Sequence, residues 1–91
     1  MTGLNTAGDE DLGRLWPAVN ASRLFPSRAE FEVFREQEPW RVRVDEAGRA
    51  VVLERWREHL DILGIKGIWC TQRDLPAVLE DVRAVARTRG Y

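Results

Sequence analysis

Few side chains in this chain could do chemistry. His59 is the only histidine, Cys70 the only cysteine and Tyr91 the only tyrosine, and the other candidates are carboxylates. Catalysis needs a nucleophile or an acid–base pair that converges in one pocket, and none of these residues has a partner at an informative spacing. One cysteine and one histidine cannot form an internal disulfide or complete a familiar zinc site. We therefore predict no catalytic residue and no metal site.

Each candidate also has an ordinary structural interpretation. A thiol such as Cys70 can be reactive near a helix start, yet a free cysteine more often packs as a small apolar side chain. His59 lies in a polar connection, which favours a solvated loop histidine over a general base. Two carboxylate pairs favour solvated faces of a helix: Glu30 with Glu32, and Glu36 with Glu38.

The segment with the clearest binding mechanism is residues 70–74. It lies between an apolar run and the last predicted helix, and free N–H groups at a helix N-terminus can bind an anion. Because every helix has such an end, the segment alone identifies no ligand.

Composition and charge exclude several classes of protein. The chain has 91 residues, with 14 Lys and Arg against 15 Asp and Glu, and a net charge of -1. It has no basic stripe, which a nucleic-acid binder needs first, and no apolar run near the roughly 20 residues that span a bilayer. We predict one domain over residues 1–91, with residues 1–5 frayed. We expect it in the cytoplasm of a bacterium, with no nucleic-acid or membrane partner.

Two helices are predicted in the N-terminal part. Thr6 and Asp9 resemble a capping box, and an apolar stripe follows, but Pro17 should kink or end this first helix at about Trp16. Ser27 with Glu30 is a clearer capping box that opens a second helix, which Pro39 stops. The apolar residues expected to face the interior are Leu12, Leu15, Trp16 and Val19 in the first helix, and Ala29, Phe31, Val33 and Phe34 in the second.

Three strands are predicted after residue 40. Trp40, Val42 and Val44 alternate with arginines, as in a strand with one buried face. A turn at residues 45–48 then leads to a return strand at residues 50–57. Residues 60–69 form a third, more apolar strand, and its glycines at 64 and 67 are typical of a bulge or a close backbone approach.

The last predicted element is an amphipathic helix. Asp74 caps its start, Pro76 sits in the first turn and Gly90 ends it. One face of this helix is apolar: Leu75, Val78, Leu79, Val82, Val85 and Ala86. The predicted fold is α+β with the order ααβββα, in which helices pack on a three-stranded antiparallel meander.

This element order resembles the first half of the GCN5-related N-acetyltransferase (GNAT) fold, an acyl-CoA N-acyltransferase fold. Residues 79–91 resemble the third helix of the family, which commonly closes on an Ala-Arg-x-x-Gly-Tyr/Phe phrase, here residues 86–91. Residues 7–12, Ala-Gly-Asp-Glu-Asp-Leu, resemble the acidic start of the first helix of the family. Together these segments extend the resemblance over nearly the whole chain.

The resemblance implies an acetyl-CoA site at the end of the third predicted strand. In the family a Q/RxxGxG/A loop holds the pyrophosphate, and the matching positions here are Cys70, Thr71, Gln72, Arg73 and Leu75. Cys70 replaces the Gln or Arg, and Arg73 and Leu75 replace the two glycines, so side chains should block the usual backbone approach to the phosphates. The resemblance also implies later strands that residues 1–91 do not include. We expect no cofactor for the isolated chain.

Three hypotheses follow for the function. The first is an interaction or oligomerisation module, non-catalytic alone; the second is the N-terminal part of an acyltransferase that binds acetyl-CoA once completed by missing strands or another chain. The third is an unrelated α+β adaptor, which a non-sequential strand order would identify. We favour the module, because the two loop glycines and half of the family's sheet are absent from residues 1–91. Under either of the first two hypotheses the third strand should have an open edge, with only Asp61 and Lys66 as charged residues that oppose association. Such an edge invites a homodimer or a partner strand, at an interface of Ile62, Ile65, Ile68 and Trp69.

Overall fold

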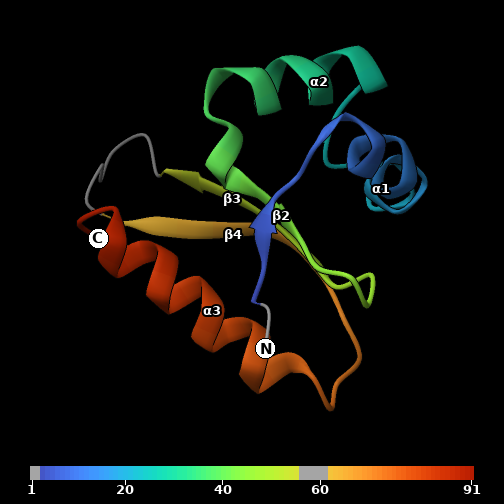
Figure 1. Ribbon diagram of the computed structural model, residues 1–91. Helices are drawn as coiled ribbons and strands as arrows, with labels where there is room; N and C mark the ends of the chain where they lie inside the picture. Colours follow the sequence, from blue (N-terminus) through green and yellow to red (C-terminus); the bar gives the residue numbers. More distant parts are fainter. Residues whose placement is uncertain (1–2, 56–61) are drawn as a thin grey trace.

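An antiparallel sheet with the strand order β1-β2-β3-β4 forms the centre of the structure, a computed structural model that describes residues 3–55 and 62–91 (Figure 1). The strands are joined in sequence, so the predicted meander is confirmed and one strand, β1, is added. The elements in chain order are β1 (Asn5–Thr6), α1 (Asp9–Ala21), α2 (Arg28–Gln37), the 3-10 turn η1 (Pro39–Arg41), β2 (Val42–Val44), β3 (Ala50–Arg55), β4 (Leu63–Trp69) and α3 (Leu75–Thr88). The fold class is α+β, as predicted.

Helices cover both faces of the sheet. α1 and α2 lie on one face and α3 lies on the other (Figure 1). Strand β3 connects the two sides, because Ala50 and Val52 join the core cluster under α1 and α2, whereas Val51 and Leu53 join the cluster under α3. These four side chains are at most 1% exposed. We call the two clusters the α1–α2 core and the α3 core.

The capping and periodicity signals of α2 and α3 are largely confirmed. The Ser27 hydroxyl accepts a hydrogen bond from the Glu30 N–H at 3.2 Å, and Phe31 is fully buried. Val33 is 51% exposed, so its predicted inward orientation is wrong, as is that of the exposed Ala29. In α3, Val78 and Val82 are buried and form the predicted inner face.

The start of the chain departs from the prediction. Residues 3–5 were expected to fray, but Leu4 is only 5% exposed and Asn5 pairs with Val44. Because Thr6 belongs to β1, it cannot cap α1 as predicted. Gly8 takes the N-cap position instead, and its N–H donates to the Asp11 carboxylate at 2.8 Å.

Helix α1 continues through Pro17, so the predicted break at Trp16 is wrong. Proline removes one backbone hydrogen bond from a helix, and here that loss falls on the exposed side of α1. Leu15 and Val19, on either side of the proline, are buried in the α1–α2 core. Burial of this stripe holds both halves of the helix in line.

The hairpin between β2 and β3 forms as predicted, although β2 begins later. Trp40 lies in η1, not in a strand, and the strand starts at Val42. The turn at residues 45–48 ends on Gly48, whose φ of 85° is the left-handed conformation that glycine adopts readily. β3 is described to Arg55; residues 56 and 57 of its predicted span lie outside the described residues.

Candidate functional site

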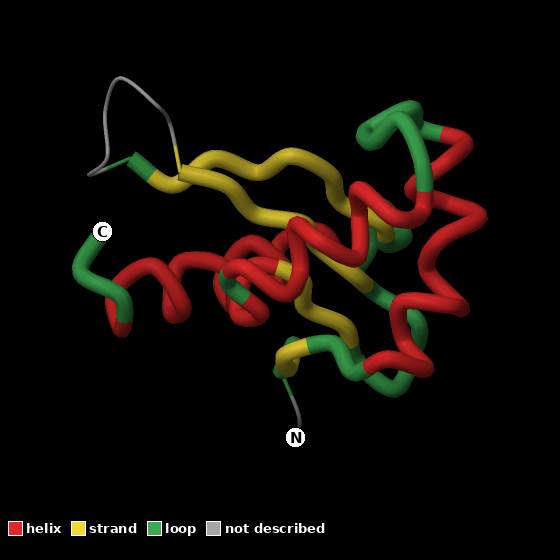
Figure 2. The backbone as a smooth tube through the Cα atoms, turned by 90° about the horizontal axis from the view of Figure 1, so that it is seen from above, coloured by secondary structure: helices red, strands yellow, loops and turns green. Residues whose placement is uncertain are grey.

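The candidate site is the outer edge of β4. Within the described sheet, β4 pairs with β3 alone, so its other edge presents unpaired N–H and C=O groups. Figure 2 shows the N-terminal segment at the opposite side of the sheet. Residues 60 and 61 of the predicted strand, including the proposed guard Asp61, lie outside the described residues. Lys66 is the charged residue of β4.

The four predicted interface residues divide into two pairs. Ile68 packs against the α3 core and Trp69 packs against the α1–α2 core. Ile62 is 45% exposed and Ile65 is 42% exposed. The structure therefore leaves two isoleucines at the edge uncovered, while Ile68 and Trp69 are half-buried anchors of the strand.

A β-bulge interrupts β4 beside Lys66. Val52 pairs with Gly67 and Leu53 pairs with Ile65, so Lys66 is the extra residue. Gly67 also allows a close approach, because a Cβ built on it would lie 2.5 Å from Cη2 of Trp69 and 2.7 Å from Cδ1 of Leu24. The sequence analysis expected a bulge or a close backbone approach at the glycines of this strand, and at Gly67 there is a close approach next to a bulge.

Two amides at the end of the loop between β4 and α3 are already hydrogen-bonded within the turn. The Asp74 N–H donates to the hydroxyl of Thr71 at 3.2 Å, and the Leu75 N–H donates to the Gln72 carbonyl at 3.4 Å. Pro76 has no N–H to offer. Asp74 occupies the predicted N-cap position, but its side chain makes no cap hydrogen bond. The side chains of Thr71, Gln72 and Arg73 are exposed.

Two of the other chemical candidates, Cys70 and Tyr91, pack against the α3 core. Cys70 is half-buried against the α3 core, and the Tyr91 ring lies 6.2 Å from the Trp40 ring, centroid to centroid. His59 lies outside the described residues. Residues 3–55 and 62–91 contain no cluster of three His, Cys, Asp or Glu side chains able to hold a metal ion. Over the same residues, no helix has the length and apolar character needed to cross a membrane.

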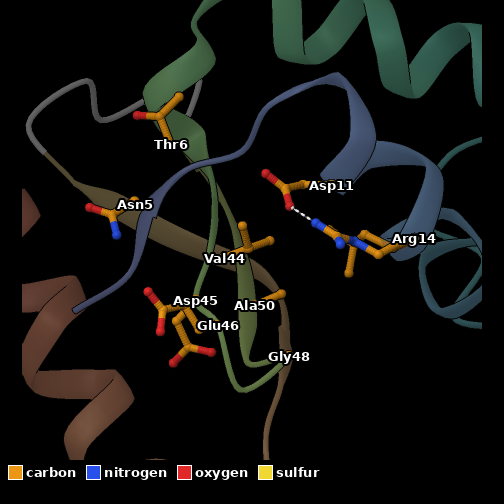
Figure 3. Close-up of a pocket in the computed structure, with 10 residues that line it drawn as sticks. Asn5, Thr6, Asp11, Arg14, Val44, Asp45, Glu46, Gly48 and Ala50 are labelled. Atoms are coloured by element: carbon orange, nitrogen blue, oxygen red, sulfur yellow. Dashed lines mark hydrogen bonds and ion pairs between the residues drawn. The ribbon is translucent and has the colours of Figure 1, made fainter. Parts of the chain in front are cut away.

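Sequence reasoning did not anticipate a hollow at the β1 end of the molecule. Its volume is about 600 Å³, and it lies between β1, the first turns of α1 and the β2–β3 turn. Figure 3 shows Asp11 and Arg14 on α1, with Asn5 on β1 and Asp45 and Glu46 on the turn. No sequence signal identified this hollow, because its walls come from three separate segments.

Three of the four charged groups of this hollow, those of Asp11, Arg14 and Asp45, have partners within the chain. The Asp11 carboxylate accepts a hydrogen bond from the Gly8 N–H and forms an ion pair with Arg14. The pKa of Asp11 lies below its usual value, mainly because of the hydrogen bond from Gly8 and also because of Arg14. Asp45 accepts from the N–H groups of Ala47 and Arg49, each at 2.9 Å, and pairs with the Arg49 guanidinium. The hydrogen bond to Asp45 raises the pKa of Arg49. These carboxylates stabilise a helix start and a turn.

An arginine of β2 binds the N-terminal segment. Nη2 of Arg43 donates to the Leu4 carbonyl at 2.9 Å, and Nη1 donates to the Trp40 carbonyl at 3.2 Å. Burial lowers the pKa of Arg43, and the neighbouring charge of Arg89 lowers it further. The guanidinium thus ties the N-terminal segment to β2 and η1.

Comparisons of the chain with protein-family models, with curated proteins and with solved structures found no significant match.

Proposed function

We propose that the chain is an acetyltransferase-like (GNAT-related) half-domain that is non-catalytic alone and acts as an interaction or oligomerisation module. In this proposal two copies form a homodimer through the open edge of β4. The observation that carries it is the coincidence of unpaired backbone groups with two exposed isoleucines, Ile62 and Ile65. An apolar edge strand of seven residues is a template for another strand.

The strand order supports the family part of this proposal. Sequential antiparallel pairing, followed by α3 after β4, is the arrangement that the resemblance implies. For an unrelated adaptor we expected a strand order other than the sequential one. The cytoplasm stays our prediction for the location.

The alternative is an N-terminal part of an acyltransferase that binds acetyl-CoA once it is completed. The start of α3 lends this alternative little support, because the amides of Asp74 and Leu75 are already hydrogen-bonded within the turn and Pro76 supplies none. An anion site at a helix start depends on such free amides. A titration with acetyl-CoA, followed by amide chemical shifts, separates the two: shifts confined to residues 70–77 favour the enzyme, and no shifts favour the module.

Ile65→Lys tests the interaction edge directly. We expect the wild-type protein to dimerise at high micromolar concentration in sedimentation equilibrium, and the variant to associate at least about tenfold more weakly, since it places a charge at an apolar contact. Thr6→Lys is the matched control, because Thr6 is an exposed strand residue at the opposite edge of the sheet. Its association constant should equal that of the wild type. A wild-type protein that stays monomeric at these concentrations would contradict the proposed function.

A further inference from the structure

The bulge in β4 determines which way its lysine points. Ile68 packs against the α3 core, whereas Gly67 lies under Trp69 and Leu24 of the α1–α2 core. In a regular strand the next residue, Lys66, would return to the α3 side, because side chains alternate. The extra residue instead leaves Lys66 on the α1–α2 side and Ile65 opposite Leu53.

Two groups on that side hold Lys66. Its ammonium lies 3.6 Å from the Glu54 carboxylate and 5.3 Å from the centroid of the Phe25 ring. The Lys66 side chain is 26% exposed and that of Glu54 is 41% exposed. Lysine at a sheet edge normally deters another strand, but here its charge is balanced by the adjacent strand.

This arrangement is compatible with a self-complementary register for two β4 edges. An isologous dimer places a two-fold axis at the contact, and an axis at Ile65 sets Ile65 of one copy opposite Ile65 of the second copy. The bulge then sets Lys66 and Gly67 together opposite Gly64, and Ile68 opposite Leu63. In each of these contacts the facing residues lie on the same side of the sheet, as cross-strand pairing requires. Continuing the alternation to Ile62 places it opposite Trp69, so all four predicted interface residues meet.

The same axis brings the two lysines together. Lys66 and Lys66 of the second copy become diagonal neighbours on one face, about 7–8 Å apart. This separation is within the screening length of physiological salt, so the two ammonium groups repel each other unless they are neutralised. One Glu54 beside each lysine makes the group of four charges neutral.

We propose that Glu54 permits self-association of β4 by neutralising Lys66 at this two-fold axis. The inference rests on the proposed function and specifies its partner: a second copy in antiparallel register about Ile65. Glu54 is therefore a positioning residue for Lys66 and makes no backbone contact with the partner strand.

The test is a mutant cycle read by sedimentation equilibrium at low salt, with Glu54→Gln, Lys66→Met and the double variant. We expect Glu54→Gln to weaken association about three- to fivefold, because half-exposed ion pairs contribute modestly and each dimer contains two. Lys66→Met should associate as well as the wild type or better. The double variant should match Lys66→Met, since Glu54 acts only through the lysine. Glu80→Gln is the control, because Glu80 forms an exposed pair with Arg83 on α3 at 2.9 Å, and it should leave association unchanged.

The outcomes separate this inference from the proposed function. If the wild type dimerises but Glu54→Gln associates equally well, the inference is wrong and the interaction module stands. The inference is also wrong if Glu54→Gln weakens association in the Lys66→Met background, because Glu54 would then act through another group. If the wild type is monomeric, both fail. Added salt should shrink the effect of Glu54→Gln, and an effect that persists in 1 M salt would count against the charge mechanism.

Discussion

The two edges of the sheet are built in opposite ways. β1 is two residues long, carries exposed polar side chains at Asn5 and Thr6, and is tied down by the Arg43 guanidinium. β4 is seven residues long and has one charged residue, and it leaves Ile65 uncovered, as is Ile62 immediately before it. Short polar edge strands are a common protection against unwanted pairing, and long apolar ones are a hazard. The contrast locates the capacity for association at β4.

Leucine truncation at the two edges should give the largest effect. Leu4→Ala removes a side chain that is 5% exposed and belongs to the α3 core, and we expect it to lower the free energy of unfolding by about 2–3 kcal/mol. Leu63→Ala removes a half-buried side chain that packs on the same core, and should cost about 1 kcal/mol. Urea unfolding followed by tryptophan fluorescence measures both. Equal losses would show that the β1 edge is no better packed than the β4 edge.

Loss of Arg43, which binds the N-terminal segment, should have the next largest effect. Arg43→Met removes both side-chain hydrogen bonds to the Leu4 and Trp40 carbonyls, and we expect a loss of about 1–2 kcal/mol. Arg73→Met, at an exposed loop position, should change stability by less than about 0.5 kcal/mol. Arg43→Met should also speed hydrogen exchange of the Ala7 amide, whose N–H donates to the Val42 carbonyl at 2.8 Å. Unchanged exchange there would mean that β1 is held without the guanidinium.

The smallest expected effect concerns the turn from β1 into α1. Asp11→Asn should cost about 0.5–1 kcal/mol at pH 7, because the carboxylate accepts from the Gly8 N–H at the helix start. The fold lowers the pKa of Asp11, so its contribution is complete above the unfolded value near 3.8 and disappears as pH falls through the folded value. Stability of both proteins measured by urea from pH 7 to pH 2.5 should therefore converge at the acid end. Glu10→Gln, at an exposed first-turn position, is the control and should show a smaller loss.

Local signals predicted much of the fold. Ser27 with Glu30 marked the start of α2, and the stripe through Val78 and Val82 marked the inner face of α3, because capping and periodicity depend on residues a few positions apart. Gly67 indicated the bulge, because a glycine inside a strand is itself a local signal. The open edge of β4 followed from the meander itself.

The errors fall where distant contacts outweigh local preference. A two-residue strand such as β1 is too short to show a periodic pattern in the sequence. It is held in place because Leu4 is buried and the Arg43 guanidinium donates to the Leu4 carbonyl. Pro17 remains inside α1 because the core binds residues on both sides of it. Lys66 contacts Glu54 and Phe25, which come close to it only in the folded chain.

The burial of β3 on both faces has a consequence for how the molecule unfolds. Val51 and Val52 are neighbours in the chain, yet one supports the layer of α3 and the other supports the layer of α1 and α2. Neither layer can detach without hydrating this strand, so melting is expected to be a single cooperative transition. The amides of β3 should be the last to exchange with solvent, at the rate set by global opening of the domain.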